Sequence, residues 1–132
     1  QIKAMKKVSG KLKLAYSQFR ELQAFAQFGS DLDKDTKQRL AQGERIVEVL
    51  KQSRSSPLAV EEQVVIIYAV INNLLSDIPV DKIRDFEKAL LEHMSAAHSD
   101  IYEAIRKTGD LTKEQFASLG EYIKSYVDQY LK

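Results

Sequence analysis

The sequence predicts an all-α fold, a helical bundle of about five to six amphipathic helices. Apolar residues recur at steps of three and four in separate windows of the 132-residue sequence, a spacing that places them on one face of a helix. Loop-forming residues are scarce, with only 5 Gly and 2 Pro. The length fits one domain whose core needs no covalent staple. Cysteine is absent, which excludes disulfides and thiolate metal sites.

Basic residues dominate the start of the sequence, although the net charge of the whole is only +1. No acidic residue interrupts them up to position 20, and they are Lys3, Lys6, Lys7, Lys11, Lys13 and Arg20. We expect a basic arm that is solvated or faces a partner. Nucleic-acid binding is disfavoured because Tyr16 and Phe19 are the only aromatic residues among these charges. Such binding would weaken steeply with added salt.

Two amphipathic helices are predicted before residue 52, with the corner Gly29-Ser30-Asp31-Leu32-Asp33 between them. Glycine can end a helix at positive φ, and acidic side chains can accept the first N–H groups of the next helix. The first apolar stripe is Ala15, Phe19, Leu22 and Ala26, flanked by Phe25 and Phe28. The second stripe is Thr36, Leu40, Gly43, Val47 and Leu50.

A third helix is predicted after a break at Ser55, Ser56 and Pro57. Glu61 and Glu62 would occupy its first turn, where the helix dipole favours acids. The run from Val64 to Ile71 is rich in β-branched residues and taken alone could be a strand. We predict helix, because a lone strand would leave its backbone groups unpaired. A helix apolar on all sides belongs at the centre of the bundle, and eight apolar residues fall far short of the ~20 that span a bilayer.

The last third of the sequence predicts two more helical segments. Pro79 should lie in the first turn of one that ends at Gly109, with an interruption around His98 and Ser99. Its apolar face is Ile83, Phe86, Leu90, Met94, Ala97, Ile101 and Ile105. The other begins with a capping box from Thr112 to Gln115 and continues through Phe116, Leu119, Ile123, Tyr126 and Tyr130. Gly120 inside it costs about 1 kcal/mol relative to Ala, so packing must hold this helix in place.

Catalytic signatures are missing from the sequence, which has no glycine-rich phosphate loop and no metalloprotease or nucleophile-elbow motif. His93 and His98 are five residues apart, whereas a helical metal pair needs four, so no metal site is predicted. The pairs Asp31/Asp33 and Glu61/Glu62 lie where helices begin and are interpreted as capping acids. Tyr122, Tyr126 and Tyr130 form a stripe typical of a core or an interface. No catalytic residue is predicted, and a binding or assembly module is favoured over an enzyme.

Five stretches, in this order and spacing, carry a family resemblance: MKKVSGKLKL (Met5 to Leu14), FRELQAFAQFGSDLD (Phe19 to Asp33), GERIVEVLKQ (Gly43 to Gln52), SPLAVEEQVVIIYA (Ser56 to Ala69) and IPVDKIRDFEKALL (Ile78 to Leu91). They closely resemble the C-terminal part of the alpha subunit of the F-type ATP synthase. The resemblance extends over nearly all of the sequence and weakens after about Ser95.

The resemblance implies that residues 1–132 form the single helical C-terminal domain of a non-catalytic subunit. This subunit alternates with catalytic beta subunits in a ring around the gamma rotor of a complex that makes ATP using a transmembrane proton or sodium gradient. The nucleotide-binding domain with its phosphate loop would lie upstream of Gln1, so this chain alone is expected to be inactive. The implied location is peripheral, at the cytoplasmic face of the bacterial cell membrane, without membrane insertion and without nucleic acid.

Two sites are implied by the same resemblance. The stretch KQSRSSP matches a loop that contacts the adenine of ATP, bound with magnesium, at the non-catalytic site of the full-length subunit. Gln52 holds the position of one adenine-facing glutamine, and Arg54 holds a second such position, where an arginine offers no amide acceptor. This chain by itself is not expected to bind ATP tightly. The corner formed by Gly29, Ser30, Asp31, Leu32 and Asp33 would face the rotor.

The alternative left open is a stand-alone helical adaptor that binds only protein partners and no nucleotide. In either case, a domain that belongs to a larger assembly should expose apolar surface where its neighbours pack.

Overall fold

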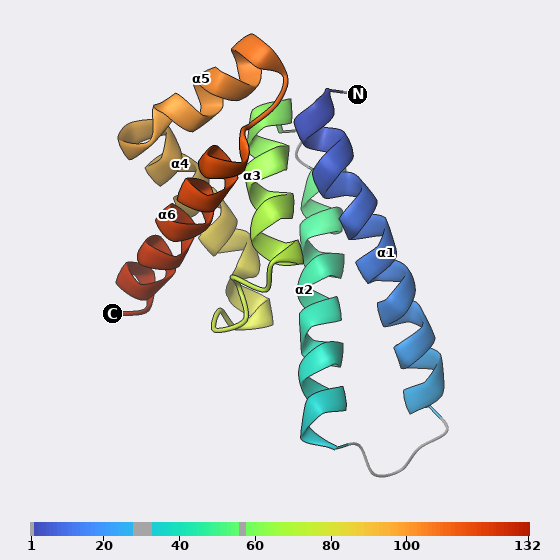
Figure 1. Ribbon diagram of the computed structural model, residues 1–132. Helices are drawn as coiled ribbons and strands as arrows, with labels where there is room; N and C mark the ends of the chain where they lie inside the picture. Colours follow the sequence, from blue (N-terminus) through green and yellow to red (C-terminus); the bar gives the residue numbers. More distant parts are fainter. Residues whose placement is uncertain (1, 28–32, 56–57) are drawn as a thin grey trace.

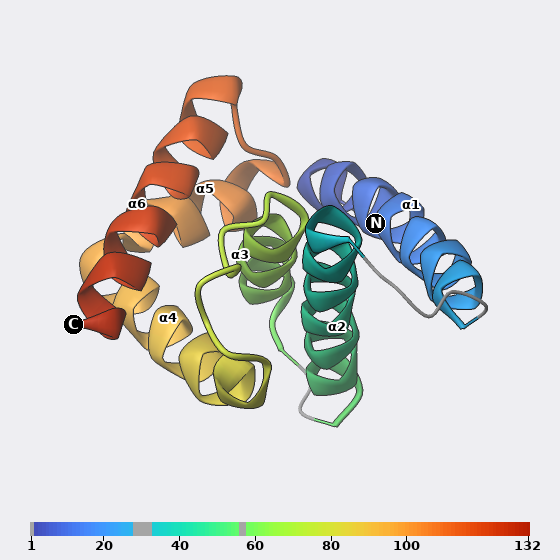
Figure 2. The same cartoon turned by 90° about the horizontal axis from the view of Figure 1, so that it is seen from below.

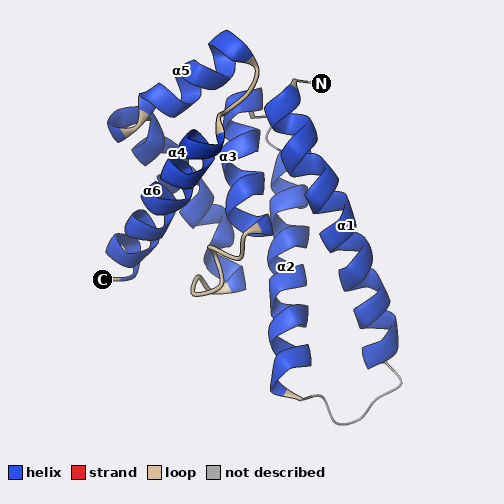
Figure 3. Ribbon diagram, in the orientation of Figure 1, coloured by secondary structure: helices blue, strands red, loops and turns tan. Residues whose placement is uncertain are grey.

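Six α-helices and one short 3₁₀ helix make up the described part of the protein, and it contains no strand (Figures 1 and 3). The computed structural model describes residues 2–27, 33–55 and 58–132, with the backbone alone for residues 52–55. The elements are α1 (Lys3–Ala26), α2 (Lys34–Ser55), α3 (Val60–Ile71), η1 (Val80–Lys82), α4 (Ile83–Ala97), α5 (Ser99–Thr108) and α6 (Lys113–Leu131). The predicted all-α bundle is confirmed.

Helix α3 lies at the centre of the molecule, with α1 and α2 on one side and α4 to α6 on the other (Figure 2). Its buried residues are Val64, Val65, Ile66, Ile67, Ala69 and Val70. Because they point in every direction around the helix axis, α3 has no solvated side over this stretch. The prediction of a helix, and not a strand, at the centre is confirmed.

The first half of α1 is a core helix, so the prediction of a basic arm is wrong. Ala4, Met5, Val8 and Leu12 are buried in the same cluster as α3. The lysines between them are exposed. Apolar residues at steps of three and four turn one face inward while every lysine points to solvent, and the distribution of charge alone does not reveal this.

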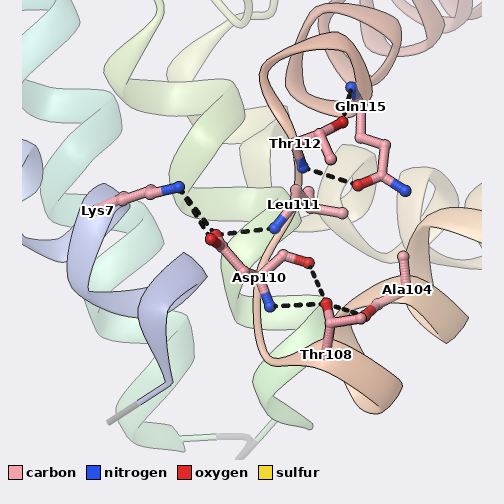
Figure 4. Close-up of polar contacts among 7 residues, drawn as sticks. All are labelled: Lys7, Ala104, Thr108, Asp110, Leu111, Thr112 and Gln115. Atoms are coloured by element: carbon pink, nitrogen blue, oxygen red, sulfur yellow. Dashed lines mark hydrogen bonds and ion pairs between the residues drawn. The ribbon is translucent and has the colours of Figure 1, made fainter.

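A polar clasp fastens the beginning of α1 to the turn between α5 and α6 (Figure 4). The backbone N–H of Ala4 donates to the carbonyl of Gly109 at 3.0 Å. The Lys7 ammonium contacts the Asp110 carboxylate at 3.0 Å. Gly109 has a φ of 73°, a left-handed conformation that favours glycine. The first helix is therefore joined to the turn that leads into the last one.

The capping box predicted at the start of α6 is present (Figure 4). The N–H of Gln115 donates to the Thr112 hydroxyl at 3.1 Å, and the N–H of Thr112 donates to Oε1 of Gln115 at 2.7 Å. Further along α6, Gly120 is buried, and a Cβ there would lie 3.3 Å from the Tyr68 hydroxyl of α3. Close packing on α3 thus accompanies the glycine, as expected.

Residues 83–108 form two α-helices, α4 and α5, and not the single interrupted helix that was predicted. His98 ends α4 and precedes α5 with a φ of −137° and a ψ of 43°, which are not helical angles. The backbone turns there so that Ile101 and Ile105 can pack onto α3, whereas Ala97 is exposed and not part of the apolar face. Pro79 precedes η1 with extended backbone, one position earlier than predicted.

Helix α2 buries a wider face than the predicted stripe because it contacts α1, α3 and α4. Ile46 and Val49 are buried, whereas Val47 and Leu50 are half-buried. Arg45 is also buried, and its Nε and Nη2 donate to the Ile78 carbonyl at 3.0 and 2.7 Å. The turn before η1 is therefore held on α2 by one guanidinium group.

A glycine lets α1 approach α2. A methyl group built on Gly43 would overlap the Phe19 ring, and Phe19 is buried. Gly10, in the middle of α1, has nothing within 4 Å of the same position and is exposed. The two glycines therefore make opposite contributions to stability.

We expect Gly43→Ala to destabilise the protein by about 1–3 kcal/mol, because the added methyl forces Phe19 out of its place. Gly10→Ala is the matched control and should stabilise by about 0.5–1 kcal/mol, since alanine is the better helix former in open space. Urea unfolding followed by circular dichroism measures both. Equal effects of the two substitutions would contradict the close approach of Phe19.

Arg45→Met should lower the free energy of unfolding by about 1–3 kcal/mol, because it leaves the buried Ile78 carbonyl without a donor. The control is Arg39→Met on the same helix, which removes an exposed ion pair with Asp35 at 3.1 Å. Exposed pairs contribute little, so that change should stay within about 0.5 kcal/mol. A small effect at Arg45 would show that the turn is held by packing alone.

Candidate functional site

The described part of the corner between α1 and α2 is a helix cap. Asp33 accepts the backbone N–H of Thr36 at 2.7 Å through its carboxylate. Hydrogen bonds from Thr36 hold the pKa of this exposed carboxyl below its usual range. The predicted capping role is confirmed for Asp33, whereas Gly29, Ser30, Asp31 and Leu32 lie outside the described residues, as does Phe28.

The segment implied to contact adenine begins inside α2. The backbone is helical through Ser55, so Gln52 and Arg54 belong to the last turn of that helix and not to a loop. Their side chains lie outside the described residues, as do Ser56 and Pro57. The role of these two residues stays a prediction.

The two ends of α2 lie far apart. The C-terminal end of α2 lies at the top of the helix in Figure 1, whereas its N-terminal end lies at the bottom, beside the C-terminal end of α1. A helix of 22 residues is roughly 33 Å long.

The acids at the start of α3 have structural partners. Glu62 Oε1 accepts the N–H of Ala59 at 3.1 Å, and Glu61 pairs with Arg106 Nε of α5 at 3.1 Å. These contacts satisfy one free N–H near the helix start and join α3 to α5. The interpretation of Glu61 and Glu62 as acids that serve the helix terminus is confirmed.

The two histidines pack against the tyrosine stripe of α6. His98 stacks on Tyr122 with ring centroids 3.7 Å apart, and His93 stacks on Tyr126 at 4.3 Å. The histidine rings meet edge to face at 5.3 Å. Burial, together with the nearby His98, lowers the pKa of His93. The tyrosine stripe is thus part of the seam between α4 and α6, and no cluster of three metal-ligating side chains occurs in the described ranges.

A groove of about 870 Å³ lies between α1 and α2, where the two helices diverge (Figure 1). This groove was not predicted from the sequence. Ala15, Phe19 and Leu22 line it on the α1 side. The predicted apolar stripe of α1 therefore forms one wall of this groove, and Phe25 beyond it is 69% exposed. The sequence did contain a sign of this groove, because the apolar stripe continues to the last turns of α1, where α1 and α2 diverge (Figure 1).

Comparison with known proteins places this helical domain in a family. The family model described as ATP synthase alpha/beta chain, C-terminal domain, matches residues 1–126. ATP synthase subunit alpha of Caldanaerobacter subterraneus subsp. tengcongensis is 52% identical over 130 residues, which make up 98% of the present sequence. ATP synthase subunit alpha of Acetivibrio thermocellus is 48% identical over 132 residues, the whole of the present sequence.

The protein is thus a helical domain of the kind that ATP synthase subunits carry at their C-terminus. It belongs to the family of C-terminal domains of the ATP synthase alpha and beta subunits, and both of these relatives are alpha subunits. It spans 26% of the length of each of the two relatives. Over the residues with described structure, no helix combines the length and the apolar character needed to cross a membrane.

The cap at Asp33 predicts a pH dependence. Because folding lowers its pKa from the usual 3.8, its contribution to stability is present at neutral pH and is lost as the pH falls through the folded pKa. Asp33→Ala should therefore lower the urea midpoint at pH 7, with a smaller difference at about pH 2.5. Asp33→Asn is the control, because asparagine still caps a helix and does not titrate. Equal midpoints for Asp33→Ala and the unmodified protein at pH 7 would refute the capping role.

Proposed function

We propose that this protein acts as the C-terminal domain of an ATP synthase alpha subunit, a structural and regulatory element in the ring of alternating alpha and beta subunits. The observation that carries the proposal is the match over residues 1–126, together with two relatives named as alpha subunits at 52% and 48% identity. The complex would make ATP from ADP and phosphate with a proton or sodium gradient. The domain would be peripheral, at the cytoplasmic face of the bacterial membrane.

The arrangement of the helices supports two separate contact sites, one for the rotor and one for the nucleotide. The pair α1 and α2 extends past the other helices, and the described end of α1 and start of α2 lie at the far end of this pair (Figure 1). We infer that this end, with residues 29–33, faces the gamma rotor. The opposite end carries the C-terminus of α2 and the start of α1, where a preceding nucleotide-binding domain would bring an ATP site close to Gln52.

Exposed apolar side chains on α1 support the proposal of neighbouring subunits. Leu14 is 61% exposed and Phe25 is 69% exposed. The two residues are eleven apart, which puts them on one side of the helix. Apolar residues on one exposed face are typical of a contact surface, and beta subunits of the ring would supply the partner.

Replacing the corresponding segment of the Caldanaerobacter alpha subunit by residues 1–132 tests the proposal. The chimeric subunit, expressed with the beta and gamma subunits, should co-purify with them as a complex that hydrolyses ATP at a rate close to that of the parent. A second chimera carrying Gly43→Ala reports how much assembly depends on domain stability. A chimeric subunit that folds but does not bind beta would overturn the proposal and favour a stand-alone adaptor.

The nucleotide role of Gln52 has its own test in the assembled chimera. Gln52→Ala should weaken binding of magnesium ATP at the non-catalytic sites by a factor of about 2 to 12, the equivalent of one lost hydrogen bond of about 0.5–1.5 kcal/mol. Nucleotide retained after gel filtration measures the effect. Arg54→Ala, in the same helical turn, shows whether the arginine also contacts the adenine. Retention unchanged by Gln52→Ala would contradict the adenine contact without contradicting ring assembly.

A further inference from the structure

A carboxyl group is buried in the apolar face of α4. Glu87 is 4% exposed and shares this helix with Ile83, Phe86, Leu90 and Leu91, which are also buried. Within the part of the protein that the structure describes, its Oε1 atom has no hydrogen-bond partner. Burying a charged carboxylate with an unsatisfied oxygen is expensive, whereas a neutral carboxylic acid is tolerated.

Glu87 faces the seam where α4 meets α2. Arg84 precedes it by three residues and so lies on the same side of α4. Arg84 shares a surface depression of about 610 Å³ with Glu48 of α2 and with Val80 and Asp81 of η1. The Glu48 carboxylate is thus the acidic group that α2 presents toward Glu87, and it contacts Lys51 on its own helix at 3.5 Å.

We propose that Glu87 is a proton-dependent latch between α4 and α2: the seam is closed while Glu87 is a neutral acid and loosens when the group ionises. The proposal concerns this domain alone and goes beyond the function proposed above. The reaction is a single proton loss from the Glu87 carboxyl to solvent, with no other bond made or broken.

The groups around Glu87 decide the direction of its titration. Burial raises the pKa of Glu87 to about 8, the Glu48 carboxylate raises it as well, and Arg84 opposes both. Asp81 of η1 lines the neighbouring depression and adds another acid. The residues that α3 and α5 bury are apolar, apart from Tyr102 of α5. Burial and the Glu48 carboxylate together outweigh Arg84 and favour the protonated state.

The sign of the effect on stability follows. A carboxyl whose folded pKa lies above its usual value of 4.5 makes no unfavourable contribution below that value, because it is neutral in both states. Stability then falls as the pH rises from 4.5 toward about 8, since only the unfolded state gains the charge. Above about 8 the folded domain holds a buried carboxylate beside Glu48, and the two repel.

Loosening of the contact between α4 and α2 would also affect α2. Arg45, three residues before Glu48 on α2, donates to the Ile78 carbonyl in the turn before η1. These hydrogen bonds connect α2 with the turn at Ile78, which leads into η1 and α4. The last turns of α2, which carry Gln52, follow directly along the same helix. A change of protonation at Glu87 is therefore placed to alter how firmly the C-terminal end of α2 is held.

The first measurement is the titration of the Glu87 carboxyl in the 132-residue protein. The NMR chemical shift of the carboxyl carbon is recorded from about pH 4 to about pH 9.5. The expected midpoint lies near 8. Glu48→Gln should move that midpoint down, because it removes the like charge on α2. A midpoint below about 5.5 in the unmodified protein would overturn the proposal.

The second measurement is urea unfolding at about pH 5.5 and about pH 8.5 for the unmodified protein and for Glu87→Gln. Between these pH values the unfolding equilibrium constant of the unmodified protein should increase more than that of Glu87→Gln, by a factor on the order of 100. Glu92→Gln is the control, because it removes an exposed carboxyl from the same helix. An equal pH dependence for Glu87→Gln and the unmodified protein would overturn the proposal.

Hydrogen exchange separates a latch from a merely strained residue. After correction for the intrinsic rates, amides of Val49 in α2 and Leu90 in α4 should lose protection at about pH 8.5 relative to about pH 6.5 in the unmodified protein, and keep it in Glu87→Gln. Amides at the start of α6, where Phe116 stacks on Tyr68 of α3 away from the contact between α4 and α2, should behave alike in both proteins. Uniform loss across all helices would show global destabilisation and reject local opening. If Glu87→Gln does not fold, the titration with Glu48→Gln decides.

Discussion

The rest of the structure depends on one constraint, which is that α3 has no polar face. A helix whose valines and isoleucines point in all directions can only exist if other helices cover it on all sides. The fold meets this need by packing α1 and α2 against one side and α4 to α6 against the other (Figure 2). The amphipathic character of the outer helices follows, because each needs one apolar side for α3 or a neighbour and one charged side for solvent.

The sequence predicted those parts of the fold in which the signal is local. The apolar run from Val64 to Ile71 and the box from Thr112 to Gln115 each contain their own explanation within one or two helical turns, and both were predicted correctly. The interruption at His98 was predicted, but the division into two helices was not, because the apolar spacing continues across it and periodicity does not distinguish a bend from a straight helix. The clasp of Lys7 on Asp110 was missed for a different reason, since the two residues are 103 positions apart.

The candidate site divides along the same line. Capping by Asp33 could be predicted because the acceptor and the N–H that it binds are three residues apart. The groove beside Phe19 depends on how far α1 diverges from α2, and the environment of Glu87 depends on which acid of α2 faces α4. Neither can be predicted from local sequence. An acid in the apolar face of α4 was the one available clue to Glu87. The roles of Gln52 and Arg54 came from resemblance alone, because an amide and a guanidinium at the end of a helix have no distinctive spacing.

The contact between Ala4 and Gly109 has a consequence for how the protein is synthesised. Within this domain α1 is synthesised before the other helices, yet the carbonyl that accepts the N–H of Ala4 and the carboxylate that accepts Lys7 belong to residues about 100 positions further along the chain. Until that turn emerges, Met5 and Val8 have no complete core in which to bury their side chains. The first helix of this domain therefore stays partly uncovered during synthesis. The core is complete only when α5 and α6 have been synthesised.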